Sequence, residues 1–430
     1  MLTRIQTLNY RCLKRIDQTL SNFDILVGGN GVGKSTFLDV ISFLSEILSQ
    51  PRDSLANALQ KRSDLFDHLL FDVAQGSFEL AIEATIPSHV VQMLGWNKGS
   101  GQLDYRIKVG YLSSNRSDVG ILSEKLLLTQ LGNSSAGIPA LSSVNVDQIM
   151  NRNGTDSQLI PDVLGCWPII SRLGPPEETT VFHREAAVQD NSGVFSQFRL
   201  SPSSSALANL PEDTTHFPAA TWFRRFLGDS VVKPVLTPED LRHPKYLTGT
   251  GFVSNADFRL AERLEAFEVN REEDFDAWLR HLRIALPDLK TITTVSEWGV
   301  RSNVVLVYND GRRVPSRLAS DGTLRLIALT LIAYAMDYGI IILIEEPENC
   351  IHPLAIEMVM QSLSSMYESQ VLVTTHSPAI LSLTAPDRIL CFSKTPEDGT
   401  MIVRGDKHPR LSAWKGNVDP GMLLASGILG

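Results

Sequence analysis

A glycine-rich segment near the start of the chain has the residue types and spacing of a phosphate-binding loop. Residues 28–36, GGNGVGKST, fit the pattern G-x-x-x-x-G-K-[ST]. Glycines let the backbone direct N–H groups at phosphate oxygens, a lysine adds positive charge, and a serine hydroxyl suits Mg²⁺. The residues that we expect to bind ATP are Gly28, Asn30, Gly31, Gly33, Lys34, Ser35 and Thr36. Of these, Lys34 is also expected to act in catalysis and Ser35 to hold Mg²⁺.

Two adjacent glutamates follow a very apolar segment in the second half of the chain. Residues 340–344, IIILI, predict a strand buried on both faces, as in a parallel sheet. Glu345 and Glu346 then lie at its carboxyl end, the edge where α/β sheets bind ligands. We predict that Glu345 holds Mg²⁺, directly or through water, and that Glu346 is the catalytic base that polarises the attacking water. Taken alone, the pair also fits a helix cap or a solvated turn.

Two further segments place polar residues at the ends of elements. Residues 371–378, VLVTTHSP, predict a strand followed by His376, which we expect to contact the γ-phosphate or the attacking water. Residues 318–325, LASDGTLR, open a helix with Ser320 as its N-cap, and a helix N-terminus attracts anions. The residues alone leave open whether this helix start binds an anion. A histidine with only a structural hydrogen bond, and a cap without a ligand, are the alternatives.

These motifs require a sheet that brings strand ends together, and the periodicity of apolar residues predicts one. The expected helices span residues 35–48, 258–268, 272–285 and 322–337, with one more beginning at Pro353. The expected strands include residues 23–27, 77–87, 103–112, 340–344, 371–374 and 388–393, with a hairpin over 304–313. Such alternation is typical of an α/β fold with a largely parallel sheet. Residues 113–235 are rich in Ser, Asn, Gly and Pro, and we expect an insertion with loops there.

We therefore divide the chain into three parts. We expect residues 1–90 and residues 291–430 to form the N-terminal and C-terminal parts of one nucleotide-binding domain, and residues 91–290 to form an insertion or lid between them. Specificity should lie in the insertion, because an ATPase core is generic. Basic residues there that could contact nucleic-acid phosphate are Arg224, Arg225, Arg242, Lys245, Arg280 and Arg283. Solvated helix faces are the simpler interpretation of these charges.

Composition restricts the partners and the compartment. The net charge of −9 argues against a bulk polyanion binder, so any contact with DNA must be a local patch. The four cysteines are far apart without a CxxC pair, which predicts reduced thiols in a cytoplasmic protein. The apolar stretch 324–344 contains Arg325, Asp337 and Gly339, so we expect a helix and a strand there and no membrane span.

Together the four motifs resemble those of the ABC-like ATPases of the SMC, RecF and OLD group. The likeness is to the compact single-chain "AAA family ATPases" of bacterial defence loci, and it covers residues 1–50 and 295–400. It implies an α/β fold: a P-loop ABC-type ATPase head with a mostly parallel sheet, antiparallel N-terminal strands and a large α-rich insertion. It also implies hydrolysis of ATP to ADP and phosphate, with Mg²⁺ as cofactor.

The resemblance assigns a role to each motif. Residues 28–36 match Walker A, Glu345 and Glu346 match Walker B, and His376 matches the switch histidine. Residues 320–322 take the place of the ABC signature, which implies that Ser320 and Gly322 contact nucleotide. Residues 348–352 take the place of the D-loop. Arg11 matches a basic residue near the nucleotide base. In this group two ATP molecules are sandwiched between two heads, which implies a homodimer.

The sequence departs from the family pattern in several places. Glu345 stands where Asp is commoner, and the signature is not L-S-G-G-Q. The Q-loop glutamine is either Gln60 or Gln75. Coiled-coil arms are not predicted. Only residues 394–430 follow the last core strand, which does not fit a C-terminal Toprim nuclease, so nuclease chemistry would belong to another polypeptide.

The function that these observations favour is an ATP-gated switch that regulates a partner effector, or acts on DNA, in anti-phage defence. A RecF-like ATPase of DNA repair or recombination is the first alternative, distinguished by stimulation of hydrolysis by DNA alone. A nucleotide-binding subunit of a transporter fits less well, because the signature differs and the insertion is long. An ATP-binding scaffold without turnover fits poorly with the presence of Lys34, Glu346 and His376.

Overall fold

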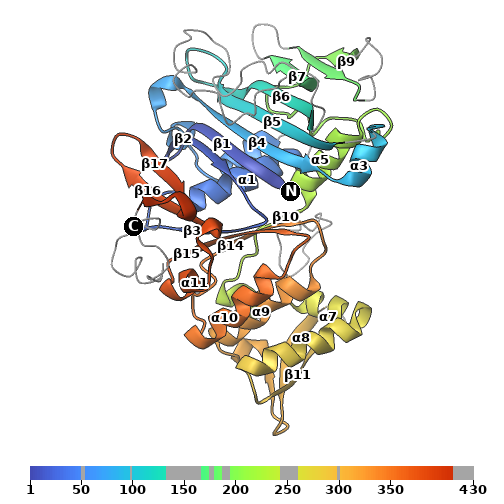
Figure 1. The fold of residues 1–430 in the computed structure, drawn as a ribbon, viewed down its shortest axis with the longest axis vertical. Helices are drawn as coiled ribbons and strands as arrows, with labels where there is room; N and C mark the ends of the chain where they lie inside the picture. Colours follow the sequence, from blue (N-terminus) through green and yellow to red (C-terminus); the bar gives the residue numbers. More distant parts are fainter. Residues whose placement is uncertain are drawn as a thin grey trace. The chain divides into compact units, whose positions relative to one another are not determined.

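The computed structural model describes eight segments of the chain, which belong to two compact units that we treat separately (Figure 1). The described residues are 1–49, 54–96, 99–131, 166–173, 179–185, 194–242, 260–297 and 301–409. Unit 1 comprises residues 1–21, 31–229 and 393–402, and unit 2 comprises residues 22–30, 230–392 and 403–430. Lys245, one of the basic residues considered above, lies outside the described residues.

Unit 1 is built on an eight-stranded sheet in the order β2-β1-β4-β5-β6-β7-β8-β9. Each neighbouring pair is antiparallel. The strands are β1 (Leu2–Tyr10), β2 (Leu13–Thr19), β4 (Ser77–Ile86), β5 (Ser100–Tyr111), β6 (Val119–Leu131), β7 (Trp167–Leu173), β8 (Thr180–His183) and β9 (Val194–Phe198). The predicted antiparallel strands at the N-terminus are thus confirmed.

Helices pack their apolar sides against this sheet. They are α1 (Lys34–Ser49), α2 (Ser54–Gln60), α3 (Ser88–Met93) and α5 (Pro218–Asp229). The ring of Phe43 on α1 lies 6.1 Å from that of Tyr10, and the ring of Phe223 on α5 lies 6.0 Å from that of Tyr105. All four side chains are fully buried. The core of unit 1 therefore lies between the sheet and the two longest of these helices, which also contact each other.

The insertion contains strands as well as helices, whereas the sequence predicted an α-rich region. Strands β5 to β9 lie within residues 91–290, and they continue the sheet that β1 and β4 begin (Figure 1). The expectation of an insertion with loops over residues 113–235 missed β6, β7, β8, β9 and α5. Their Ser-rich and Gly-rich surroundings hide the alternation, and pairing with neighbouring strands decides their conformation.

Unit 2 contains most of a six-stranded sheet in the order β10-β14-β15-β3-β16-β17. The strands are β10 (Val231–Val232), β14 (Ile341–Glu345), β15 (Gln370–Thr375), β3 (Phe23–Val27), β16 (Ile389–Thr395) and β17 (Gly399–Arg404). The first five are parallel to their neighbours. Strands β14 and β15 are buried almost throughout, which explains their continuous apolar sequences. The predicted largely parallel sheet is confirmed.

Helices and a small sheet complete unit 2. They are α6 (Pro238–Arg242), α7 (Leu260–Asn270), α8 (Glu272–Ala285), α9 (Asp321–Ala335), α10 (Pro353–Ser364), α11 (Pro378–Ser382) and the antiparallel strands β11 (Leu289–Glu297), β12 (Arg301–Tyr308) and β13 (Arg313–Pro315). Helix α9 contacts both α8 and α10. The fully buried Trp278 of α8 donates a hydrogen bond of 3.0 Å from Nε1 to Thr330 Oγ1 on α9.

The apolar stretch 324–344 forms a helix and a strand, as predicted. It covers most of α9 and of β14, with Gly339 at φ +76° in the turn between them. Within the part of the chain that the structure describes, no helix combines the length and apolarity that crossing a membrane requires.

Candidate nucleotide site

The phosphate loop follows β3 and leads into α1. Gly31 has φ +75° and Gly33 has φ +106°, a backbone region that side chains with a Cβ rarely adopt. A Cβ on Gly33 would lie 2.5 Å from Thr400 Oγ1 and 3.0 Å from Cys12 Sγ, whereas a Cβ on Gly31 would meet nothing within 4 Å. The loop conformation therefore requires glycine at position 33 for two separate reasons.

Contacts within unit 1 hold the second half of this loop. Thr400 Oγ1 donates a hydrogen bond of 2.8 Å to the carbonyl oxygen of Val32. Cys12 Sγ donates to Thr36 Oγ1 over 3.4 Å. The side chain of Lys34 is buried. Sequence reasoning missed Thr400 and Cys12, because neither belongs to the motif.

Arg11 lies in unit 1, in the turn between β1 and β2, with φ +51°. Its guanidinium reaches Asp39 Oδ2 on α1 over 3.4 Å, and it remains 39% exposed. Asp39 also accepts a hydrogen bond of 2.7 Å from the Tyr10 hydroxyl and forms an ion pair of 2.7 Å with Arg62. Arg11 is thus tied to the helix that carries Lys34, while its expected contact with the nucleotide base stays a prediction.

Glu345 ends β14 and carries an unsatisfied carboxylate oxygen. Its Oε2 lies 3.5 Å from Nζ of Lys233, the residue that follows β10. Its Oε1 is buried and has no hydrogen-bond partner within the described residues. A buried carboxylate oxygen without a donor is costly unless a cation or water meets it. Glu345 therefore fits the role of a Mg²⁺ ligand.

Glu346 and His376 lie together at the ends of adjacent strands. His376 Nε2 is 3.7 Å from Glu346 Oε1, and both side chains are partly exposed. The backbone N–H of Glu346 donates to the carbonyl oxygen of Thr374 over 2.9 Å, so pairing with β15 continues one residue beyond β14. Asn349 Nδ2 donates a hydrogen bond of 2.7 Å to Glu346 Oε2. Glu346 itself has φ +48°, which is rare for a non-glycine residue.

Glu348 positions His376. Its Oε1 accepts hydrogen bonds of 2.8 Å from Thr375 Oγ1 and from the backbone N–H of His376. Because the Thr375 side chain is fully buried, this contact fixes the end of β15 from within. The sequence resemblance placed Glu348 in the D-loop region but gave no sign of this bond.

The signature segment begins α9. Ser320 is the N-cap, and its hydroxyl accepts a hydrogen bond of 3.2 Å from the N–H of Thr323. Asp321 forms an ion pair with Arg242 of α6. A Cβ on Gly322 would lie 2.3 Å from the carbonyl oxygen of Cys350, so only glycine fits there. A packing reason for Gly322 thus exists alongside its predicted contact with nucleotide.

Most of the basic residues proposed for DNA contact have protein partners. Arg224 and Arg225 pair with Glu212, at 2.6 and 3.5 Å. Arg242 pairs with Asp321, and Arg283 donates to the carbonyl oxygens of β11. Structural roles account for these side chains, which leaves the exposed Arg280 as a surface charge.

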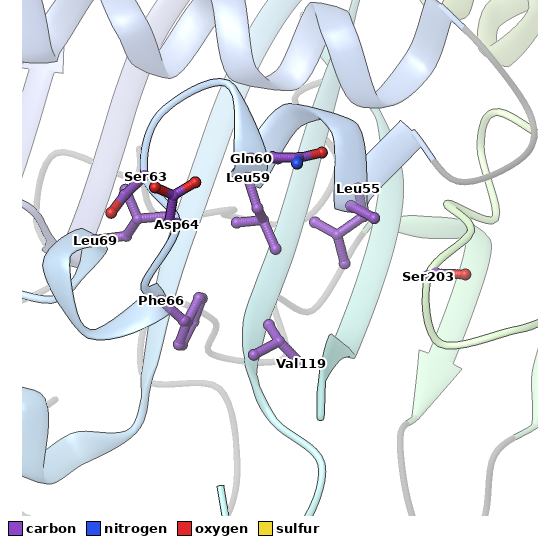
Figure 2. Close-up of a pocket in the computed structure, with 10 residues that line it drawn as sticks. Leu55, Leu59, Gln60, Ser63, Asp64, Phe66, Leu69, Val119 and Ser203 are labelled. Atoms are coloured by element: carbon purple, nitrogen blue, oxygen red, sulfur yellow. The ribbon is translucent and has the colours of Figure 1, made fainter. Parts of the chain in front are cut away.

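Gln60, one candidate for the Q-loop glutamine, lines a pocket of about 410 Å³ in unit 1 (Figure 2). The other candidate, Gln75, donates from Nε2 to Asp72 over 3.2 Å. The residues that line the pocket are Leu55, Ala56, Leu59, Gln60, Ser63, Asp64, Phe66, Leu69, Val119 and Ser203. None of these residues belongs to the phosphate loop, so the pocket is separate from the loop.

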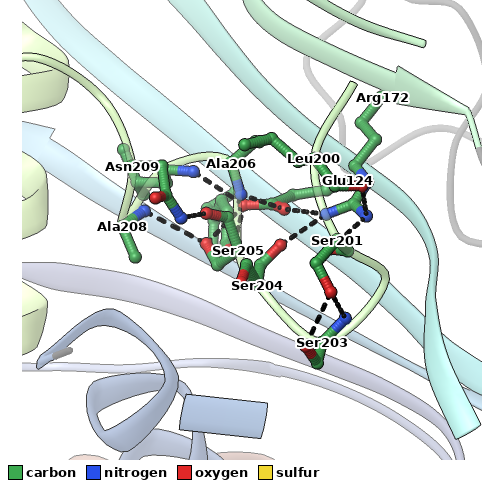
Figure 3. A network of polar contacts seen from close by, with 12 residues as sticks. Glu124, Arg172, Leu200, Ser201, Ser203, Ser204, Ser205, Ala206, Ala208 and Asn209 are labelled. Carbon is green, nitrogen blue, oxygen red and sulfur yellow. Dashed lines mark hydrogen bonds and ion pairs between the residues drawn. The ribbon is translucent and has the colours of Figure 1, made fainter. Parts of the chain in front are cut away.

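A buried carboxylate anchors the serine-rich segment 201–208 to the sheet of unit 1 (Figure 3). Glu124 of β6 accepts hydrogen bonds from the hydroxyls of Tyr105 and Ser205, at 2.9 and 2.7 Å. Arg172 of β7 lies 3.9 Å from the same carboxylate and donates to the carbonyl oxygen of Ser204. Figure 3 shows Arg172 and Ser205 beside Glu124. Their role is structural, because they are buried and mutually satisfied.

The family of the chain follows from a profile match. The family described as "AAA domain, putative AbiEii toxin, Type IV TA system" matches residues 155–382, just over half of the 430 residues. The chain belongs to this family. The matched range includes the signature, Walker B and histidine segments of this AAA-domain protein, while the phosphate loop precedes it. No curated protein matches the chain.

The comparison with solved structures lists three SMC heads. A structure described as the SmcHead bound to the C-winged helix domain of ScpA matches with a TM-score of 0.50 and 14% identity, covering 94% of this chain and 97% of that chain. An SMC head domain from Thermotoga maritima has a TM-score of 0.39 and 10% identity, covering 94% and 98%. A Pyrococcus furiosus Smc head with an extended coiled coil has a TM-score of 0.44 and 14% identity, covering 94% and 95%. At this identity the first match shows a shared fold, so the expected likeness to an SMC head is confirmed for the fold. Membership of the AAA-domain family rests on the family match.

Proposed function

We propose that this AAA-domain protein is an ATP-hydrolysing switch. The supporting observation is that β14, β15 and β3 are adjacent parallel strands whose carboxyl ends lead to Glu345, His376 and the phosphate loop. In register, Glu345 pairs with Thr374, and Thr375 pairs with Val27, the residue before the loop. Glu345, His376 and Gly28, the first residue of the loop, therefore lie at or directly after strand ends at one edge of the sheet in unit 2. This is the edge where α/β folds bind ligands, which supports the proposal.

The residues at this edge suit attack of water on the γ-phosphate. Glu346 accepts a proton from the attacking water as the new P–O bond forms, and the bond to ADP breaks to leave ADP and phosphate. His376 holds the water or the γ-phosphate. Lys34 and the glycine backbone bind the phosphates. Glu345 and Ser35 would hold Mg²⁺, which neutralises charge that develops on the phosphate oxygens.

The proposal extends to assembly and biological role. The signature would contact the nucleotide of a second copy, so that ATP binding closes a homodimer and hydrolysis releases it. The family description names a toxin and a type IV toxin–antitoxin system. We therefore propose that the ATP state regulates a separate effector protein, for which a nuclease is one candidate, in anti-phage defence. DNA is a second candidate ligand, to be separated by experiment.

The first test is ATP turnover by the purified protein with and without duplex DNA. Glu346→Gln should reduce turnover by about 100-fold or more, because the general base is lost. Glu357→Gln, which alters an exposed glutamate of α10, is the matched control and should match the wild-type protein. Turnover that rises several-fold with DNA would identify DNA as a ligand. Turnover unaffected by DNA would favour a protein trigger, and absence of turnover in the wild-type protein would contradict the proposal.

A further inference from the structure

Arg325 lies in the second turn of α9 and reaches the Walker B segment. Its Nη2 donates hydrogen bonds of 2.8 Å to the carbonyl oxygen of Glu346 and 3.2 Å to that of Glu345. Its Nη1 donates to the carbonyl oxygen of Leu236 over 3.1 Å. The sequence had marked Arg325 only as a charge that interrupts an apolar stretch, so this contact was not expected.

The two carbonyls belong to the peptide planes on either side of the Glu346 Cα. The orientation of the peptide before a residue sets its φ, and that of the peptide after it sets its ψ. One guanidinium therefore holds both backbone dihedrals of Glu346. That hold matters because Glu346 has φ +48°, a conformation that persists only when its surroundings impose it.

The same helix touches the other end of the segment. Gly322, in the first turn of α9, lies so close to the carbonyl oxygen of Cys350 that no Cβ fits between them. Cys350 also has a left-handed backbone, with φ +64°. Helix α9 thus contacts residues 346–350 at both ends, and both ends hold a conformation that is unfavourable for a non-glycine residue.

Arg325 is costly as a purely structural residue. Its Nε is buried without a hydrogen-bond partner within the described part of unit 2. A buried donor left unsatisfied destabilises a fold. In return, the guanidinium holds the backbone of Glu346 through its hydrogen bonds to the carbonyl oxygens of Glu345 and Glu346.

We propose that Arg325 is a positioning residue for ATP hydrolysis, which fixes the Glu346 carboxylate in place and links it to the signature segment on the same helix. This proposal rests on the proposed ATPase function. In this proposal, a movement of residues 320–322 at the start of α9 would also move Arg325 and so change the position of the Glu346 carboxylate. Among the described residues, the hydrogen bonds of Arg325 go to backbone carbonyls of Leu236, Glu345 and Glu346 and not to the phosphate loop. Its loss should therefore affect turnover more than ATP binding.

The test compares Arg325→Gln and Arg325→Lys with the wild-type protein. In Arg325→Gln we expect kcat at saturating ATP to fall roughly 30-fold or more, while the Kd for a fluorescent ATP analogue stays within about threefold. Arg325→Lys keeps the charge but not the forked donors, so it should restore only part of kcat. Arg317→Gln, at an exposed arginine just before α9, is the matched control and should leave kcat and Kd unchanged.

A double variant makes the test specific to Glu346. If Arg325 acts through the base, Arg325→Gln added to Glu346→Gln should cost no further turnover, because the group that it positions is already lost. Should Arg325→Gln not fold, the same comparison is made with Arg325→Lys. A kcat within twofold of wild type, a parallel loss of ATP binding, or additive losses in the double variant would overturn the proposal. Failure of the wild-type protein to hydrolyse ATP would overturn the proposed function, and this proposal with it.

Discussion

At the scale of single residues, the two reactive segments differ in how they accommodate unusual backbone. The phosphate loop uses Gly31 and Gly33, for which a positive φ carries little cost. The segment after β14 instead places Glu346 in that region, at a cost of roughly 1–3 kcal/mol. The phosphate loop therefore adopts its conformation because glycine tolerates a positive φ. The conformation of Glu346 depends instead on contacts such as those of Arg325.

Substitution of the two loop glycines by alanine should weaken ATP binding to different degrees. In Gly33→Ala the added Cβ would displace Thr400 Oγ1, which holds Val32, and would also strain the backbone. We expect ATP binding to weaken by roughly 100-fold. In Gly31→Ala only the backbone is strained, so we expect a loss of about tenfold. Titration with a fluorescent ATP analogue measures both, and equal losses would contradict this account.

At the scale of elements, α5 begins at a buried carboxylate. Glu185 is fully buried, and its two oxygens accept hydrogen bonds of 2.6 and 2.8 Å from the N–H groups of Ala219 and Ala220. Burial raises the pKa of Glu185 to about 8, although these two hydrogen bonds act in the opposite direction. The carboxyl group is therefore more easily ionised in the unfolded chain than in the folded protein.

This raised pKa predicts how stability depends on pH. The folded state binds the proton of Glu185 more tightly, so its contribution is complete below about pH 4.5 and is lost as the pH rises through about 8. The melting temperature of the wild-type protein should fall between pH 5.5 and 8.5. In Glu185→Gln this fall should shrink, whereas Glu212→Gln, at an exposed glutamate, should leave it unchanged. A fall of the same size in Glu185→Gln would disprove the assignment.

Elements with strong periodicity could be predicted from the sequence, but their contacts could not. The helix expected at 272–285 has those bounds in the structure, and the predicted strand 340–344 corresponds to β14. Strands β6 to β9 were missed because they are stabilised by pairing across the sheet. The bonds that orient the site join residues remote in sequence, such as Thr400 and Val32, which are 368 positions apart. Local patterns hold no information about such partners.

At the scale of the whole molecule, two exposed leucines lie beside the D-loop region and the signature. Leu354 is 85% exposed at the start of α10, directly after the D-loop region 348–352. Leu318 is 72% exposed just before the signature. Large apolar side chains at such exposure favour burial against a partner, and these two lie beside the segments that we propose to form the dimer interface.

We predict that two copies of the chain associate only when ATP is bound. Glu346→Gln with saturating ATP and Mg²⁺ should sediment as a dimer, and as a monomer without nucleotide. Adding Leu354→Glu should prevent the dimer while ATP binding is retained, because a charge would have to be buried. Leu383→Glu, at a leucine of unit 2 that is 49% exposed, is the control and should leave dimerisation intact. Analytical ultracentrifugation gives the result, and a monomeric Glu346→Gln at saturating ATP would count against the sandwich.

The indole of Trp278 makes α9 optically observable. It lies fully buried between α8 and α9, and its N–H is bonded to Thr330 of the helix that carries both the signature and Arg325. Indole emission responds to changes in hydrogen bonding and polarity around the ring. A displacement of α9 that accompanies each ATP cycle would therefore modulate the native fluorescence of the protein. The chain thus contains a built-in label with which the sequence of binding, closure and release can be timed without a dye.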